Sequence, residues 1–355
     1  MSTVPFRDIL LAGAAGDAIG YVVEFDDVET IKESYGPHGL RGPLSLDGSG
    51  EWLISDDTQM TLFTIDGIFW SRQRGDALTK GLYRSYMRWY YMQTGEEPRR
   101  GQKSWLKKQP YETTYNLAKD HRLQERRHPG MTCLTALRDP ADRGMTQPLN
   151  DSKGCGGIMR VAPIGLYFHG DPEAAYENGC ACAAITHSHP SGYIAAGAMA
   201  SYLALLCDGH TLRQAGKVVK EMLRVKENAD EVYDAIVAAE KAAAKVPALR
   251  KKAGADDWWY YLPGLEALGE GFVAEETLAI ALYCALAYSG SRYAVLAALN
   301  HGGDSDSTAG ICAQLVTAEA GRNRIPEEWL EHLECRDIII DMADRLEKIS
   351  FEEKA

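Results

Sequence analysis

Two short clusters of carboxylates and hydroxyls lie far apart in the chain, at residues 55–58 (SDDT) and 304–307 (DSDS). Each precedes apolar residues at helical spacing, so each is expected to open a helix. The simplest role is a helix cap, because Asp and Ser accept hydrogen bonds from the free N–H groups of a first turn. The alternative is that the two helix starts meet and form one polar pocket.

A shared pocket would hold four carboxylates together with the hydroxyls of Ser55, Thr58 and Ser307. Like charges a few ångströms apart raise one another's pKa values, so protons or a cation must compensate them. The helix dipole contributes only about 0.3–1 kcal/mol per charge, too little for four. A divalent cation is the simplest compensation. An all-oxygen ligand set favours Mg²⁺, with Mn²⁺ as an alternative, and this many acids can hold two ions.

Residues 13–25 (GAAGDAIGYVVEF) add two further acids among closely spaced glycines. Asp17 is expected to be a hydrogen-bond anchor at a helix end. Glu24 lies among apolar residues. A carboxylate in such company either points to solvent or transfers a proton, and the residues alone leave both open.

Glycines also cluster in residues 152–160 (SKGCGGIMR), where backbone N–H groups could contact an anion beside Lys153 and Arg160. The loop matches neither the P-loop nor G-x-G-x-x-G, so ATP and NAD sites of those kinds are unsupported. It is either a simple turn or, beside a metal pocket, a phosphate-binding loop. His187 and His189 are two residues apart, which does not place both on one helical face, so we expect packing or pocket-wall roles.

The elements that must position these residues are helices. Apolar residues recur at helical spacing and strand patterns are scarce, so the predicted fold class is all-α, a compact multi-helix bundle. Apart from the two helices after the acidic clusters, we expect helices at 76–93, 172–186, 191–207, 211–225, 229–245, 274–287, 292–299 and 326–348. Residues 160–168 (RVAPIGLYF) are the nearest to a strand, although their proline and glycine argue for a turn or a helix break.

Length and composition indicate an ordinary globular protein. The 355 residues are 45% hydrophobic and 25% charged, without a linker or repeat, so we expect one domain over 1–355, in which residues 100–128 could be a peripheral insertion. The net charge of −12 disfavours nucleic acid and anionic membranes as partners. Eight scattered cysteines fit reduced thiols. With no secretory signal or membrane span predicted, we expect a cytoplasmic protein.

Taken together, the motifs resemble the ADP-ribosylglycohydrolase family, which includes dinitrogenase reductase-activating glycohydrolase and the eukaryotic ADP-ribosyl-acceptor hydrolases. The resemblance spans residues 13 to 315 and rests on GAAGDAIGYVVEF, SDDTQM, RRHPGMTCLTAL, SKGCGGIMRVAPIGL, THSHPSG, GFVAEETLAIALYC and NHGGDSDSTAGICAQL, in the family's order. It implies an all-α fold with a binuclear magnesium centre that cleaves the bond at the anomeric carbon of ADP-ribose.

The resemblance also implies roles for individual residues. The metal ligands would be Ser55, Asp56, Asp57, Asp304, Asp306 and Ser307, and the catalytic residues Glu24 and Asp304. Substrate would contact Gly154, Cys155, Gly156, Gly157, Arg160, His187 and, at adenine, Phe272. Serines stand at 55 and 307 where threonine is common, and KGCGG replaces the Gly-Asn-Gly type of loop found in some members. The loop difference puts substrate preference in question, but not the metal centre.

The expected function is magnesium-dependent removal of ADP-ribose from a modified protein side chain, with arginine favoured. Metal-bound ribose hydroxyls, polarised water and an oxocarbenium-like centre would accompany proton transfer by Glu24 or a ligand-shell aspartate. One alternative is a binding protein that sequesters an ADP-ribosyltransferase through the basic segment 103–127. Another is a metal-dependent hydrolase of a different nucleotide-sugar or phosphoester.

Overall fold

A computed structural model describes residues 5–96, 108, 110, 114–138, 148–253, 264–288 and 292–352. These residues form helices and no strand, apart from two isolated β-bridges. The α-helices are α1 Phe6–Gly20, α2 Val28–Tyr35, α3 Asp56–Arg74, α4 Leu78–Thr94, α5 Met131–Arg138, α6 Ala162–Tyr167, α7 Pro172–Ala184, α8 Pro190–Cys207, α9 Leu212–Leu223, α10 Asp230–Ala253, α11 Ala274–Ala287, α12 Arg292–Leu299, α13 Ser305–Ala320 and α14 Arg336–Glu352. The predicted all-α class is confirmed.

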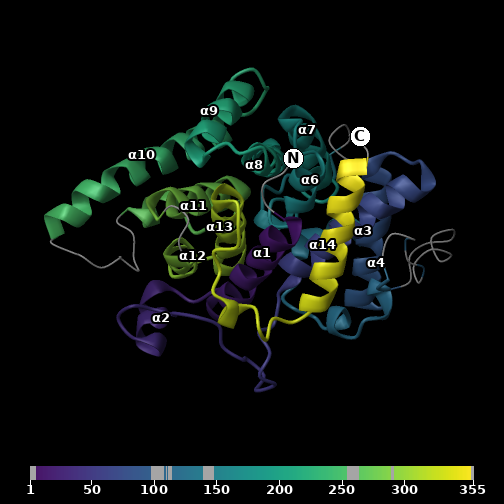
Figure 1. Cartoon of the computed structure of the whole chain (residues 1–355), viewed down its shortest axis with the longest axis horizontal. Coiled ribbons are helices and arrows are strands. Elements are labelled where there is room, and N and C mark those ends of the chain that lie inside the picture. Colours follow the sequence, from purple (N-terminus) through teal and green to yellow (C-terminus); the bar gives the residue numbers. More distant parts are fainter. Residues whose placement is uncertain are drawn as a thin grey trace.

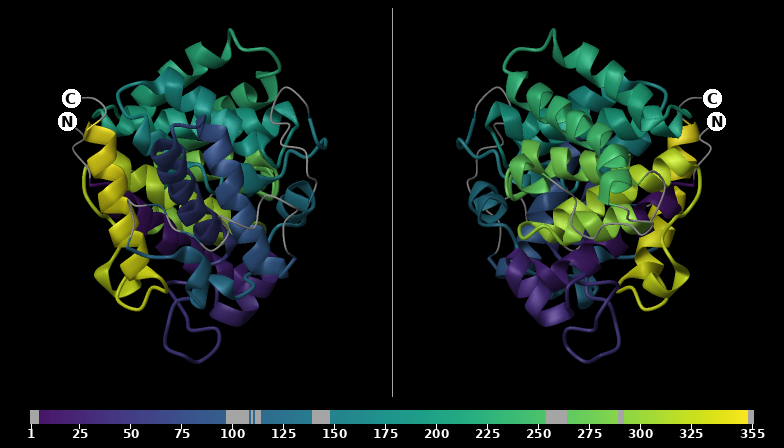
Figure 2. Two further views of the ribbon diagram at one scale, coloured as in Figure 1. Left: turned by 90° about the vertical axis from the view of Figure 1, so that its right-hand side faces the viewer. Right: turned by 90° about the vertical axis from the view of Figure 1, so that its left-hand side faces the viewer.

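The helices are arranged around α1, which lies in the middle of the molecule (Figure 1). Its most extensive partner is α13, and α3 packs on α4 in the same way as α7 packs on α8. Helix α14 runs along one edge, and its end lies beside the beginning of α1 (Figure 2), where the rings of Phe6 and Phe351 stack with centroids 6.4 Å apart. The first and last helices are therefore neighbours.

Helices α1 and α13 touch backbone to backbone because α1 presents glycines to α13. A Cβ atom added to Gly16 would lie 2.5 Å from the carbonyl oxygen of Ala309, and one added to Gly20 would lie closer still to that of Ser305. No real Cβ atom tolerates such distances, so the glycines are what allow this crossing. The crossing brings the end of α1 against the beginning of α13.

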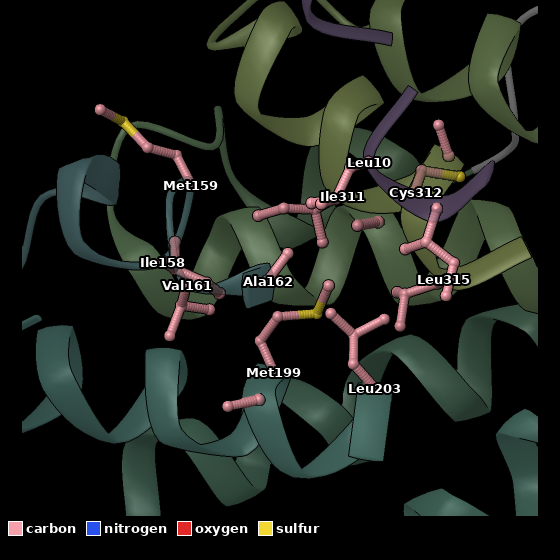
Figure 3. Packing of buried hydrophobic residues seen from close by; sticks show 14 of the residues in the cluster. Leu10, Ile158, Met159, Val161, Ala162, Met199, Leu203, Ile311, Cys312 and Leu315 are labelled. Carbon is pink, nitrogen blue, oxygen red and sulfur yellow. The ribbon is translucent and has the colours of Figure 1, made fainter. Parts of the chain in front are cut away.

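A continuous hydrophobic core holds the helices in place. In the close view of Figure 3, Met199 and Leu203 of α8 point toward Ala162 and Ile311, which belong to α6 and α13. The core also contains charge, since the fully buried Arg88 pairs with Asp66. A buried pair of this kind is costly to break, because the remaining charge would have no partner.

One helix prediction is wrong, and one segment expected to contain a turn or a helix break is helical. Residues 160–168, the nearest to a strand pattern, contain α6, because Pro163 occupies the first turn of that helix, where its missing N–H costs nothing. The helix expected at 326–348 is instead a short 3₁₀ turn, Glu327–Trp329, followed by α14. The other predicted helices agree with the structure within a few residues, except that α10 continues beyond residue 245.

Other predictions concern the chain as a whole. All eight cysteines are free, as expected. Among the described residues only α8 is long and apolar enough to cross a membrane, and 89% of that window is buried, as in the core helix of a soluble protein. Residues 100–107, 109 and 111–113 of the expected peripheral insertion lie outside the described part. The single domain and the cytoplasmic location stay predictions.

Candidate functional site

The N-terminal ends of α3 and α13 meet at one cavity of about 340 Å³. Its lining includes acids and a hydroxyl from both helix starts: Asp56, Asp57, Asp304, Asp306 and Ser307. The Ser307 hydroxyl donates a hydrogen bond of 2.8 Å to Asp57 Oδ2, across 250 positions of sequence. The two acidic clusters therefore lie together.

Asp17 of α1 fastens the first turn of α3. Its carboxylate accepts hydrogen bonds from the backbone N–H groups of Ser55 at 3.0 Å and Thr58 at 3.1 Å, and from the Thr58 hydroxyl. The predicted anchoring role is present, although Asp17 anchors a neighbouring helix as well as lying near the end of its own. Because α1 also packs on α13, this contact positions the start of α3 near the start of α13.

The two clusters differ in how they cap their helices. Ser55 is a true N-cap, since its hydroxyl accepts from the Asp57 N–H at 3.2 Å, and its buried side chain is absent from the cavity lining. The structure therefore places Ser55 as a cap and does not bring it to the other predicted ligands. Asp304 holds the N-cap position of α13 but makes no side-chain cap hydrogen bond. Capping alone does not account for Asp304.

Burial and mutual repulsion strongly raise the pKa values of these acids. Burial raises the pKa of Asp56, Asp57 and Asp304 well above the usual aspartate range, and the charge of Asp306 raises each of them further. The same two causes raise the pKa of Asp17 to about 7 and that of Glu24 to about 10. Such shifts are typical of functional sites, because an uncompensated acid cluster has no structural benefit.

The donor set fits a hard divalent cation in its chemistry. It consists of buried carboxylate and hydroxyl oxygens, the ligands that Mg²⁺ and Mn²⁺ prefer, and a cation would offset the repulsion that raises the pKa values. Its geometry is not that of a preformed site, since the described residues contain no group of three or more His, Cys, Asp or Glu side chains placed to hold a metal ion.

Glu24 lies between the acids and the solvent. It lines the cavity, and its Oε2 lies 3.0 Å from Nδ1 of His128, whose side chain is 54% exposed. His128 belongs to a cluster of residues at the cavity opening, which we call the mouth: Phe25, His128, Met131 and Phe272. The rings of Phe25 and Phe272 stack nearly parallel, with centroids 6.1 Å apart.

The glycine loop forms another part of the cavity wall, beside the acids, since the Cys155 thiol hydrogen-bonds with Asp304. Gly154, Cys155 and Gly156 line the cavity, and the Cys155 N–H donates to the Phe272 carbonyl at 3.1 Å, which ties the loop to the mouth. Gly157 does not reach the lining, because it packs against Ala183. The neighbouring lysine of the predicted anion loop does not line the cavity either, since it pairs with Glu231 and Glu275.

Arg160 is not a cavity residue, contrary to the prediction. Its side chain is fully buried in the core, where the guanidinium donates to the Thr186 hydroxyl at 2.7 Å and lies 4.2 Å from the centre of the Tyr86 ring. The two histidines also separate: His187 lines the cavity, whereas His189 caps α8 by accepting from the Ser191 N–H. The pocket-wall role fits only the first of them.

Several residues of the site carry no signal in the sequence. The Gly130 N–H donates to Asp56 Oδ2 at 3.1 Å. Glu334 accepts from the Ile54 N–H at 3.2 Å and pairs with Arg127, whose carbonyl in turn accepts from the Asp56 N–H. Only the motif RRHPGMTCLTAL, which contains Arg127 and Gly130, pointed to this part of the chain, and it assigned no roles.

Comparison with known proteins now adds an independent observation. A family model described as ADP-ribosylglycohydrolase matches residues 5–354. The chain belongs to the ADP-ribosylglycohydrolase family. This confirms the resemblance of the motifs and supports a hydrolase activity, and the family is generally metal-dependent.

This ADP-ribosylglycohydrolase family member matches one relative in length and one solved structure in length and fold. The chain is 27% identical over 345 residues to an uncharacterized protein of Archaeoglobus fulgidus, covering 96% of this chain and 95% of the relative. Among solved structures it is similar to an ADP-ribosylglycohydrolase-related protein complex, with a TM-score of 0.54, 23% identity, and coverage of 98% and 99% of the two chains. The second likeness shows the fold alone.

Proposed function

We propose that this protein is a magnesium-dependent hydrolase that releases ADP-ribose from a modified protein side chain, with arginine as the first candidate for the modified residue. The observation that carries the proposal is the convergence of five acids, Glu24, Asp56, Asp57, Asp304 and Asp306, on one cavity. The cavity volume lies within the range of small-molecule sites, about 300–1,000 Å³. Membership of a glycohydrolase family gives this acid cluster a reaction class.

The metal would be held by the acids and the hydroxyl of the inner wall: Asp56, Asp57, Asp304, Asp306 and Ser307. Two Mg²⁺ ions are proposed, with Mn²⁺ as a substitute. When bound, such ions polarise substrate oxygens and lower the pKa of a bound water. Ser55 is left out of this set because its hydroxyl already caps α3.

Glu24 is the proposed proton-transfer residue, with Asp304 as the second candidate. The raised pKa of Glu24 suits a carboxyl group that holds a proton until the leaving group requires it. Its contact with the exposed imidazole of His128 offers a route for that proton to return from solvent. This arrangement also answers whether Glu24 points outward, since its side chain is 10% exposed and faces the cavity.

The part of the wall formed by the glycine loop would receive the nucleotide portion. Gly154, Gly156 and His187 line the cavity together, so backbone and imidazole could both contact phosphate or ribose. Phe272 at the mouth offers an aromatic face to adenine, and stacking of a base on such a face contributes about 1–3 kcal/mol. The aglycone, attached to its protein, would then remain at the mouth.

The test is release of free ADP-ribose from a panel of defined substrates, linked through arginine, serine or a nucleic-acid base, with and without Mg²⁺. Wild-type protein should act on one class and require the ion. Asp304→Asn and Asp306→Asn should reduce turnover by about 10³-fold, the size expected for a group that acts mainly in the transition state. Asp234→Asn is the control, because Asp234 is exposed on α10.

Two outcomes would contradict the proposal. Turnover that survives in both folded site variants would remove the acids from the chemistry. Tight binding of an ADP-ribosyltransferase without turnover of any substrate would favour the sequestering protein, and cleavage of only free nucleotide-sugars would favour the other hydrolase. Far-ultraviolet circular dichroism of each variant separates loss of activity from loss of fold.

A further inference from the structure

Arg160 is a fully buried cation with an unusual set of partners. The comparable arginine, Arg88, is also fully buried and pairs with the carboxylate of Asp66. Within the described part of the chain, Arg160 forms no ion pair and instead contacts neutral groups. A buried charge is costly unless its hydrogen bonds are well used, so the partners of Arg160 indicate what the charge accomplishes.

The shortest hydrogen bond of Arg160 goes to Thr186, just before the cavity histidine. Its guanidinium donates a hydrogen bond of 2.7 Å to the Thr186 hydroxyl and one of 3.3 Å to the Cys182 carbonyl. A guanidinium has donors and no acceptor, so the Thr186 oxygen must accept in this contact. The same oxygen lies 2.9 Å from Nδ1 of His187 and 3.5 Å from the Ala183 carbonyl.

The number of protons available in this series of hydrogen bonds determines the tautomer of the His187 imidazole. A hydroxyl has a single proton. At Thr186 the imidazole nitrogen at 2.9 Å is better placed than the Ala183 carbonyl at 3.5 Å, which is at the limit of a hydrogen bond, and it is a stronger acceptor than the Cys133 sulfur, which also contacts Thr186. The Thr186 hydroxyl therefore donates to Nδ1 of His187. Burial and the charge of Arg160 lower the pKa of His187 to about 3, so the ring is neutral and its one proton is on Nε2.

Nε2 faces the glycine loop of the cavity. No described residue hydrogen-bonds with this nitrogen, and His187 belongs to the cavity lining. A Cβ atom at Gly156 would lie 2.7 Å from Cε1 and 3.2 Å from Nε2 of the ring, and one at Gly154 would lie 3.3 Å from Nε2. Only glycine at these two positions lets the loop approach this edge of the imidazole so closely without a side chain against it, and His187 is 2% exposed.

We infer that Arg160 and Thr186 are positioning residues that fix His187 as the Nε2–H tautomer, so that the cavity presents a neutral donor to an acceptor oxygen of its ligand. The opposite tautomer would present a lone pair and repel the same oxygen. The tautomer follows from contacts inside the protein, whereas the ligand, a phosphate or ribose oxygen of ADP-ribose, rests on the proposed function. Arg160 thus acts on the cavity without lining it.

The tautomer is measured by ¹⁵N NMR of histidine-labelled protein, with His187→Gln identifying the resonances among nine histidines. Wild-type His187 should give the pattern of a protonated Nε2 and an unprotonated Nδ1. Thr186→Val, which replaces the hydroxyl by a methyl group, should abolish this preference, and Thr186→Ser should restore it. A protonated Nδ1 in the wild type, or an unchanged tautomer in Thr186→Val, would overturn the inference.

The ligand part is tested by calorimetric titration of the same folded variants with ADP-ribose. Thr186→Val should weaken binding about 10-fold, as expected for one lost hydrogen bond to a charged or polar group, and Thr186→Ser should remain within about 2-fold of wild type. A tautomer that changes while affinity does not would overturn the donor role. Failure of the wild type to bind ADP-ribose would reject the proposed function while the NMR result still supports the positioning role of Thr186.

Discussion

At its inner end the cavity is bounded by aspartates that are at most 7% exposed, whereas Phe25 and Met131 at the mouth are 62% and 70% exposed. The inner acids are held by hydrogen bonds from backbone and hydroxyl groups of other segments, as for Asp56 and Asp57. The mouth is held mainly by ring contacts, which are weaker and less directional.

This difference separates two tasks of the site. Positions that must act on a reacting bond need to be fixed closely, and the inner end rests on the backbone contact of α1 with α13. Positions that admit one modified protein or another can adjust, and the mouth has exposed side chains for that purpose. Under the proposed function, the inner end would set the reaction and the mouth would select the aglycone.

The largest effect is expected from an acid of the inner end. Asp57→Asn should reduce turnover by about 10³-fold, equivalent to about 4 kcal/mol of transition-state stabilisation. The same substitution should raise the melting temperature of chelator-treated protein, because it removes one of the mutually repelling carboxylates that share the cavity. Steady-state kinetics and calorimetry measure the two effects. A variant that is both active and less stable would remove Asp57 from the acid cluster's function.

The support of the inner end should be nearly as sensitive. Gly20→Ala places a methyl group against the backbone of Ser305 and Asp306, so it should lower the free energy of unfolding by about 1–3 kcal/mol and weaken Mg²⁺ binding. Gly42→Ala is the matched control, since its Cβ would only reach ordinary contact, 3.4 Å from the Trp329 ring nitrogen. Equal denaturation midpoints for the two variants would mean that the α1–α13 contact can relax.

At the mouth, the expected loss is in affinity and not in the chemical step. Phe272→Ala should raise the dissociation constant for ADP-ribose about 10-fold, since a stacked base contributes about 1–3 kcal/mol, and should change kcat little. Met131→Ala removes an exposed side chain of the same mouth without a ring, so it should stay within about 2-fold of wild type. If Phe272→Ala lowers kcat more than affinity, Phe272 contributes to the chemical step, as the residues of the inner end do.

Glu24 lies between the inner end and the mouth, and its raised pKa predicts that the stability of the protein depends on pH. Its folded-state pKa is raised from 4.5 to about 10, so the folded protein binds this proton more tightly than the unfolded chain. Stability from Glu24 is therefore full below about pH 4.5 and declines as pH rises toward 10. In chelator, the stability advantage of Glu24→Gln over wild type should grow by about 1.4 kcal/mol for each pH unit between about pH 6 and 8, measured by denaturant titration. Added Mg²⁺ should reduce this gain.

The smallest effect concerns the backbone of the mouth. Phe25 has a φ of 71°, a left-handed conformation that disfavours bulky residues. Phe25→Gly should therefore leave stability unchanged or raise it by up to about 1 kcal/mol, whereas Phe25→Ala keeps the strain and loses the stacking. The comparison of the two variants by thermal denaturation isolates the backbone contribution. A glycine variant less stable than the alanine variant would show that position 25 is not strained.

Local patterns predicted much of the fold. The predicted bounds of α11 and α12 agree with the structure. Apolar residues recur there at helical spacing, and the residues that end each helix lie next to it in the sequence. The pairing of the acidic clusters was one of two alternatives, beside separate helix caps, because like charges that meet would need a shared compensation. Both inferences use information that lies within a few residues of the feature itself.

Side-chain direction and distant contacts could not be predicted in this way. Arg160 is two residues before α6, and nothing nearby in the sequence says that it points into the core. Glu334 contacts Ile54 across 280 positions, and the mouth joins Phe25 to Phe272. Such pairs depend on how whole helices are placed, so a single sequence without its fold leaves them undetermined.

The backbone contact between α1 and α13 also has a consequence for synthesis on the ribosome. Helix α1 emerges well before α13, yet the surface that fits its glycines appears only when α13 is complete, and the bond from Ser307 to Asp57 closes a span of 250 positions. Long-range closures of this kind form late and slowly. The acids of the two clusters consequently stay apart, and repel little, until α13 has been translated.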